Sequence, residues 1–116
     1  MPRRTDAPVA AVEEARRHYR LRRRRDQEFG PKLFGEPAWD LLLDLYIAAS
    51  DPRLVSVVSA SMAASVSTQD TTRWLTILEE QGLVERFESG TDGSRAIVTL
   101  SQTAFDQMTR LLDERS

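Results

Sequence analysis

The chain of 116 residues contains no cysteine, a single lysine and a single histidine. The lack of cysteine excludes disulfide bonds, thiolate zinc sites and cysteine-based redox sensing. No apolar run approaches the roughly 20 residues that a membrane-spanning helix needs, so we expect no membrane partner. The N-terminus is polar and basic without an apolar centre, which argues against a secretory signal, and we expect a cytoplasmic protein.

Residue clusters that would indicate catalysis are also missing from the sequence. His18 has no second histidine or carboxylate cluster to complete a catalytic pair or a metal site. No glycine-rich phosphate loop is present. Asp40 and Asp44 stand four residues apart, and we interpret them as the solvated face of a helix. We therefore expect no enzyme, no cofactor and no metal.

The net charge of −2 conceals two parts of opposite sign. Residues 1–25 hold nine arginines and three acids, a net charge of +6, whereas residues 26–116 carry a net charge of −8. Charge asymmetry of this size suggests an arm that meets a polyanion, or one that folds onto its own acidic body.

Periodicity and turn residues divide the chain into a disordered lead, an arginine-rich helix, a main domain and a C-terminal helix. The expected boundaries of these parts are residues 1–8, 9–29, 36–100 and 101–116. The lead has only prolines and small or polar residues, which offer nothing to pack. The arginine-rich helix has a thin apolar stripe, made of Val12, Ala15 and Tyr19. We therefore expect this helix to pack against another element.

The first half of the main domain predicts two helices with a short strand between them. Pro37 suits the first turn of the first helix, where its missing N–H costs little. Residues 54–57 are compatible with a short strand. In the modest helix that follows, we expect Met62 and Ala63 to contact the core.

The second half of the main domain predicts a helix at residues 67–81 and a hairpin at residues 83–100. Ser67 suits the N-cap, with Asp70 as a shortened capping-box partner, and Gly82 suits the left-handed end of the helix. One face of this helix is polar and free of acids. It consists of Ser67, Thr68, Gln69, Thr72, Arg73 and Thr76.

A helix–turn–helix followed by a hairpin is the order of a winged helix DNA-binding domain. Its recognition helix enters the major groove with the first residues toward the base edges. Glutamine can read adenine and arginine can read guanine through two hydrogen bonds each, and threonine offers a hydroxyl and a methyl group. The polar face of residues 67–81 fits this task. An ordinary surface helix with a threonine-rich exterior would show the same residues.

The arginines outside this helix have more than one interpretation. In the hairpin, Arg86 and Arg95 would lie over the minor groove or its phosphates, or else pair with neighbouring acids at little gain in stability. In the N-terminal helix, Arg22, Arg23 and Arg24 would contact DNA phosphates. Alternatively, that helix mediates dimerisation with its arginines paired to acids, or it is an arm that orders only on binding.

Two short motifs give the sequence a specific resemblance. Residues 82–86 read GLVER, and residues 92–101 read DGSRAIVTLS. Together they resemble the MarR family of bacterial winged helix regulators, which carry a GLVER step after the recognition helix and a DxR wing strand. The resemblance spans roughly Trp39 to Leu112. The wing arginine of the family falls on Ser94 here, and Arg95 follows it.

The resemblance implies a mainly α (α+β) fold, a winged helix-turn-helix with a two- or three-stranded antiparallel β-wing and flanking N- and C-terminal helices. It also implies a homodimeric, sequence-specific transcription regulator that binds double-stranded DNA. Some family members hold a small aromatic effector between the dimer helices and the winged domain. The aromatic residues that would line such a pocket, and that also suit the core, are Phe29, Phe34, Trp39 and Tyr46.

A protein-interaction module is the competing class of function. Winged helices also serve as scaffolds and adaptors, and the net charge of −8 over residues 26–116 disfavours DNA. Random duplex DNA distinguishes the two classes, because only a DNA-binding protein shows steeply salt-dependent binding to it.

Overall fold

The architecture is known from a computed structural model. It describes residues 7–30, 33, 35–51, 53–87 and 96–113. Residues 1–6 of the expected lead, the hairpin turn, Phe34 and Arg95 lie outside the described residues.

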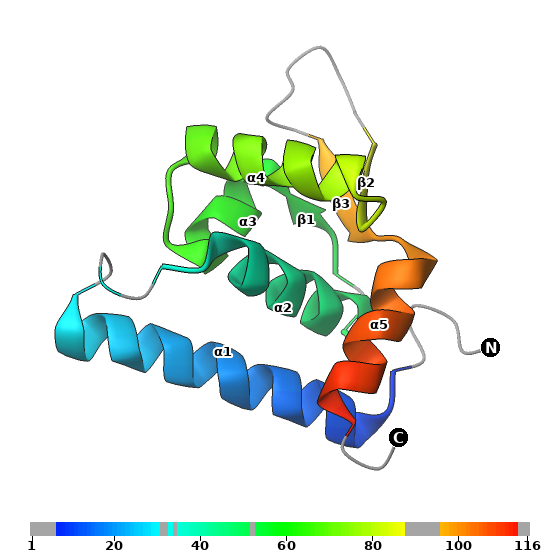
Figure 1. Ribbon diagram of the computed structural model, residues 1–116, viewed down its shortest axis with the longest axis horizontal. Helices are drawn as coiled ribbons and strands as arrows, with labels where there is room; N and C mark the ends of the chain where they lie inside the picture. The colour runs from blue at the N-terminus through cyan, green and yellow to red at the C-terminus, as the bar shows by residue number, and fades with distance from the viewer. Residues whose placement is uncertain (1–6, 31–32, 34, 52, 88–95, 114–116) are drawn as a thin grey trace.

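Five helices and three short strands make up the described chain (Figure 1). They are α1 (Val9–Phe29), α2 (Pro37–Ser50), β1 (Val55–Ser56), α3 (Val57–Ala64), α4 (Thr68–Glu80), β2 (Val84–Phe87), β3 (Ile97–Leu100) and α5 (Gln102–Leu112). This order confirms the expected fold class, a mainly α winged helix with flanking helices at both ends.

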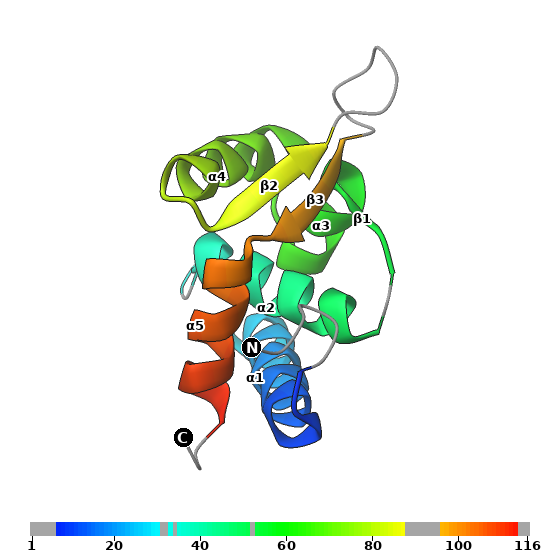
Figure 2. The same ribbon diagram turned by 90° about the vertical axis from the view of Figure 1, so that its right-hand side faces the viewer.

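The three strands form one antiparallel sheet in the order β1-β3-β2. Val55 of β1 pairs with Val98 of β3, and Val84 of β2 pairs with Leu100. These four side chains are buried, as the alternation of a sheet with one covered face requires. Figure 2 shows the sheet beside α4, with α5 running from β3 toward the N-terminal end of α1. The wing is therefore the three-stranded variant.

Helix α2 lies in the middle of the fold, between α1 and the pair of α3 and α4 (Figure 1). Pro37 occupies its first turn, as predicted. Tyr46 is completely buried and stacks on Phe105 of α5, with 5.3 Å between the ring centroids. Its hydroxyl and the Oγ1 of Thr109 form a hydrogen bond of 2.7 Å. One aromatic side chain thus ties α5 to the central helix.

Helix α3 buries a different face from the one predicted. Met62 is 75% exposed, so the expectation that it contacts the core is wrong. The buried apolar side chains of α3 are Val57, Ala60 and Ala64, which follow helical spacing. Met62 lies two residues from both Ala60 and Ala64, and that spacing turns it away from their face.

The two aspartates of α2 do not form a solvated face. Asp40 is 2% exposed and Asp44 is 6% exposed. Arg22 and Arg23 of α1 bind Asp40, and the Arg53 Nη2 donates to Asp44 Oδ1 at 2.7 Å. The expectation that Asp40 and Asp44 face solvent is therefore wrong. Their carboxylates can be buried because arginines from other segments pair with them.

Candidate nucleic-acid interface

Local sequence signals determine where α4 begins and ends. The backbone N–H of Asp70 donates to the Oγ of Ser67 at 3.0 Å, which confirms Ser67 as the N-cap. The Asp70 carboxylate binds Arg73, with 2.5 Å between Nη2 and Oδ1. Gly82 follows the helix with φ of 75°, the left-handed conformation expected of it. Local signals in the sequence thus define both ends of α4.

The inner face of α4 packs on the body of the protein. Thr71, Leu75 and Leu78 are buried, and Trp74 is half-buried against the core. The outer face lies along the edge of the molecule, on the side opposite α1 (Figure 1). Its predicted contact residues divide by exposure. Ser67, Thr68, Gln69, Thr72 and Arg73 are exposed, whereas Thr76 is half-buried.

Two of the three threonine hydroxyls of this face, those of Thr72 and Thr76, are already engaged within the protein. Thr72 Oγ1 donates to the carbonyl oxygen of Thr68 at 2.9 Å, and Thr76 Oγ1 donates to that of Thr72 at 3.0 Å. Both residues can therefore offer a ligand a methyl group and an acceptor, but no free hydroxyl hydrogen. Gln69 and Arg73 retain planar donor groups without a full set of partners among the described residues.

Arg86 of β2 lies against α4. Its Nη2 donates to the Oε1 of Glu79 at 2.8 Å and to the Oγ1 of Thr76 at 3.2 Å. The guanidinium therefore joins the sheet to the C-terminal half of α4, and it occupies one of the two acceptor positions of the Thr76 hydroxyl. The sequence left two interpretations of Arg86 open, contact with the minor groove or pairing with a neighbouring acid. The acid that Arg86 binds, Glu79, lies in α4 and not in the hairpin.

The arginines of α1 do not join the outer face of α4. Arg22 is 6% exposed and forms hydrogen bonds with Asp40 and with Glu36, the latter at 3.0 Å. The hydrogen bond with Asp40 raises the pKa of the Arg22 guanidinium, which keeps it charged. Arg22 therefore joins α1 to Asp40 of α2 and to Glu36, and it is too buried to make the expected contact with DNA.

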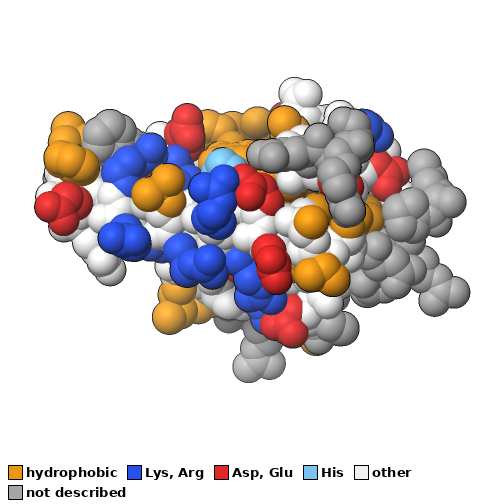
Figure 3. Space-filling view, turned by 90° about the horizontal axis from the view of Figure 1, so that it is seen from below, with side chains coloured by type: hydrophobic (Ala, Val, Ile, Leu, Met, Phe, Trp, Pro, Cys, Tyr) orange, Lys and Arg blue, Asp and Glu red, His pale blue; other side chains and the backbone are white. Residues whose placement is uncertain are grey.

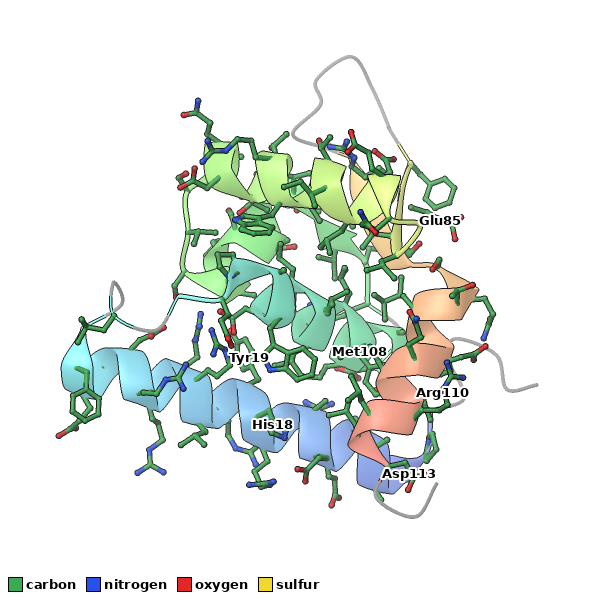
Figure 4. All side chains as sticks on the ribbon, in the orientation of Figure 1. His18, Tyr19, Glu85, Met108, Arg110 and Asp113 are labelled. Atoms are coloured by element: carbon green, nitrogen blue, oxygen red, sulfur yellow. The ribbon has the colours of Figure 1, made fainter. Side chains whose placement is uncertain are left out.

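Arg23 connects α1 to the turn ahead of α4. Its Nη1 donates to the carbonyl oxygen of Ala63 at 2.9 Å and to the Oγ of Ser65 at 3.0 Å. Tyr19 points from α1 toward the same region (Figure 4), and its hydroxyl donates to the carbonyl oxygen of Ala63 at 2.8 Å. Sequence reasoning missed this connection. Its only signal was an excess of arginine beside a helix that carries Asp40 among apolar residues.

Arg24 is exposed on α1, together with Arg17 and Arg20. Figure 3 shows basic side chains along this side of the molecule, with apolar and acidic ones between them. Because α1 and α4 lie on opposite sides of α2, a duplex that touches the outer face of α4 would not reach Arg24 of the same protomer. The structure therefore separates the two sets of predicted contacts.

Of the four aromatic residues that could line an effector pocket or belong to the core, Phe34 lies outside the described residues, and the other three lie in different surroundings. Tyr46 is core, Phe29 is 61% exposed, and Trp39 packs edge-on to His18 with 6.3 Å between centroids. A cleft of about 350 Å³ does lie between α1, α2 and α3, but Trp39, Tyr46 and Phe29 do not line it. Its lining residues are Arg16, Tyr19, Arg20, Asp44, Ile47, Arg53 and Ala63.

The part of the chain that the structure describes has neither a candidate metal site nor a candidate membrane span. It contains no group of three or more histidine, aspartate or glutamate side chains placed to hold a metal ion. None of its helices has the length and apolar character needed to cross a bilayer.

Comparison with known proteins gives matches at the level of structure. No protein-family profile matches the sequence, and no curated protein does so either. Among solved structures, a MarR family transcriptional regulator from Silicibacter pomeroyi matches with a TM-score of 0.54 and 19% identity. The match covers 83% of this chain and 62% of that one, so the chain spans less than two thirds of that regulator.

Two further structures match over a larger share of their length. S. aureus MepR in its DNA-binding conformation has a TM-score of 0.57 and 16% identity, with 86% of this chain and 74% of that one covered. The MarR family regulator NMB1585 from Neisseria meningitidis has a TM-score of 0.57 and 17% identity, with 89% and 70% covered. The chain therefore has the winged helix-turn-helix fold of the MarR-family transcriptional regulators.

Proposed function

We propose that the protein is a sequence-specific DNA-binding transcription regulator and not an enzyme. The observation that carries this proposal is the outer face of α4, where Gln69 and Arg73 are exposed at the edge of the molecule. At 13 residues, α4 is about 20 Å long and of a size that the major groove admits. The sheet beside it would act as the wing.

The spacing of the two side chains suits base reading. Residues four apart on a helix have Cβ atoms about 5–6 Å apart, so Gln69 and Arg73 project side by side. Base pairs follow one another every 3.4 Å or so, and the two planar groups would therefore meet base pairs one or two steps apart. Glutamine pairs with adenine and arginine with guanine, so each half-site would contain both bases close together.

The solved structures support this proposal at the level of the fold. One match is the complex of S. aureus MepR with DNA, at a TM-score of 0.54 and 17% identity. That protein therefore binds DNA with a fold similar to the one described above. For this chain, DNA binding is argued from the outer face of α4 and not from the low identity.

We further propose a homodimer that works in the cytoplasm, where its DNA target would be. Val9 of α1 is 74% exposed and Leu111 of α5 is 69% exposed, on two helices that contact each other. A second copy covering this end of the molecule would bury both side chains. The two recognition helices would then reach major grooves about 34 Å apart on a pseudo-palindromic site.

Titration of random duplex DNA at two salt concentrations tests the proposed class of function. A protein that neutralises about 6–10 phosphates should lose roughly 10³–10⁵-fold in affinity between about 50 and 200 mM salt. Retention that does not depend on salt, or no retention at low salt, would contradict DNA binding.

A protein-interaction module is the second candidate, and one observation favours it. Ile77 of α4 and Phe87 of β2 are 45% and 53% exposed on neighbouring elements, which suits an apolar partner. If random DNA is not retained, this candidate predicts that a double substitution of both residues by serine leaves the fold intact and abolishes any association with a protein partner.

A further inference from the structure

Beside the acid-free outer face of α4 lies one carboxylate that a DNA-reading helix does not obviously need. Asp70 lies in the first turn, and its carboxylate pairs with Arg73 at 2.5 Å between Oδ1 and Nη2. The two side chains are 47% and 74% exposed. An ion pair as open as this adds little to folding stability, so stability alone gives a weak reason for its position.

A carboxylate at this place has opposing effects on a nucleic-acid interface. It suits the positive end of the helix dipole, which favours acids in the first turn. In a groove lined by phosphates, however, its charge is repelled, and it cancels the charge of the arginine beside it. Asp70 would therefore weaken binding to DNA of any sequence, because such binding is mainly electrostatic.

We propose that Asp70 is a specificity-determining residue that holds Arg73 in position to read one guanine. This inference rests on the proposed function. Asp70 takes one Nη2 hydrogen, and the other N–H groups of Arg73 have no partner among the described residues. The end of the guanidinium can then still present two donors to O6 and N7 of guanine.

The ion pair with Asp70 restricts Arg73 in two ways. Both favour hydrogen bonding to a base over electrostatic binding to a phosphate. A free arginine side chain loses considerable rotamer freedom when it is fixed on a base, and a partner that already restrains it reduces this loss. The neighbouring carboxylate also makes a phosphate oxygen a poorer partner for Arg73. Both effects raise the ratio of specific to non-specific affinity.

Few other side chains of the outer face can donate two hydrogen bonds to a base. Thr72 and Thr76 have donated their hydroxyl hydrogens to backbone carbonyls, and Arg86 is held by Glu79 and Thr76. Discrimination by two-pronged hydrogen bonding therefore falls to Arg73 and to Gln69, which has no hydrogen-bond partner among the described residues.

The test compares wild type with Asp70→Asn on a duplex site enriched from a random pool. Each base pair of the site is then substituted in turn, and affinities are measured at fixed salt. We expect Asp70→Asn to bind random duplex more tightly than wild type. At the guanine read by Arg73, its discrimination should fall about fivefold or more. In an Arg73→Ala background, the same substitution should leave discrimination at that base pair unchanged.

Two further variants separate positioning from bulk charge and from folding. Asp106→Asn makes the same change in charge on α5, where Asp106 accepts a hydrogen bond from Gln102 at 3.0 Å, and it should leave discrimination unaltered. Asp70→Glu keeps a carboxylate within reach of Arg73 and should restore most of the discrimination. Thermal unfolding of each variant confirms that the comparison is made between folded proteins.

The outcomes distinguish this inference from the function it rests on. If Asp70→Asn tightens binding to every duplex equally and keeps discrimination at every base pair, the positioning role is wrong while DNA binding stands. If wild type enriches no site and binds no duplex, the proposed function fails, and the role of Asp70 fails with it.

Discussion

Arg22 of α1 and Asp40 of α2 form a buried ion pair in which two guanidinium nitrogens bind the two carboxylate oxygens. The Nη2–Oδ2 distance is 3.1 Å, and Nε binds Oδ1. The two side chains are 8% and 3% exposed. Two parallel hydrogen bonds fix the relative orientation of the two side chains and also attract them. The ion pair fixes α1 on the central helix, so α1 is a part of the fold and not a free arm.

Removing one partner of this pair should destabilise the protein strongly. Arg22→Met keeps much of the side-chain volume but leaves the Asp40 carboxylate with less compensation, and such losses typically cost about 3–5 kcal/mol. Arg23 also binds Asp40, at 2.9 Å, so we expect the lower end, about 3 kcal/mol, in urea unfolding. The exposed Arg24→Met is the control and should change stability by less than about 0.5 kcal/mol. Equal effects of both variants would contradict a structural role for Arg22.

Stability should fall in alkaline solution, partly because of Tyr46. Burial raises the pKa of its hydroxyl above the ordinary value of about 10. The unfolded chain then loses the tyrosine proton at a lower pH than the folded one. The stabilisation is complete below pH 10 or so and is lost as pH rises through the folded-state pKa. Unfolding free energies measured between pH 8 and 12, approximately, should show this decline.

The matched variant for this effect is Tyr46→Phe. It loses the hydrogen bond with Thr109 and should be less stable at neutral pH by about 1 kcal/mol. Its stability should decline less steeply above pH 10 or so, because the titrating hydroxyl is gone. Parallel curves for the two proteins would show that Tyr46 does not contribute to the alkaline loss.

The end of α4 supplies a test of backbone conformation. Gly82 has φ of 75°, and a Cβ placed on it would meet no atom within 4 Å. Gly82→Ala should therefore destabilise the protein by about 1–2 kcal/mol through the left-handed conformation alone. Gly35 also has open space at its Cβ position but does not have a positive φ in the strained range. Gly35→Ala should be neutral or slightly stabilising, and thermal unfolding of the pair compares the two positions.

Replacement of Arg73 should weaken binding to a specific site. If it holds a base through two hydrogen bonds, Arg73→Ala should cost roughly 1–3 kcal/mol at fixed salt. Arg110→Ala is a suitable control, because Arg110 is exposed on α5 (Figure 4) and lies outside the proposed interface. A loss of less than about twofold for Arg73→Ala would show that Arg73 does not read a base.

Helix α4 was predictable from the sequence because its signals are local. A serine cap, an apolar stripe at helical spacing and a terminal glycine act within one segment, and Ser67, Leu75 and Gly82 all occupy the expected positions. The position of α1 was not predictable in the same way. It depends on Arg22 and Arg23 meeting Asp40, which is 17 or 18 residues away in the sequence.

The composition of the candidate site was only partly predictable for a similar reason. Exposure of Gln69 and Arg73 follows from helical spacing, since Thr71, Leu75 and Leu78 form the inner face. Whether a polar side chain is available to a ligand depends on contacts between elements. Arg86 bonds across to α4, and no pattern within the hairpin indicates that contact.

Selection of bound sequences from a random duplex pool tests the central claim, that the outer face of α4 reads DNA. Wild type should enrich a two-fold symmetric motif with half-site centres about 10–10.5 base pairs apart. The double variant Gln69→Ala, Arg73→Ala should lose preference at the base pairs those residues read. Enrichment of no motif, or of the same motif by the double variant, would contradict the account.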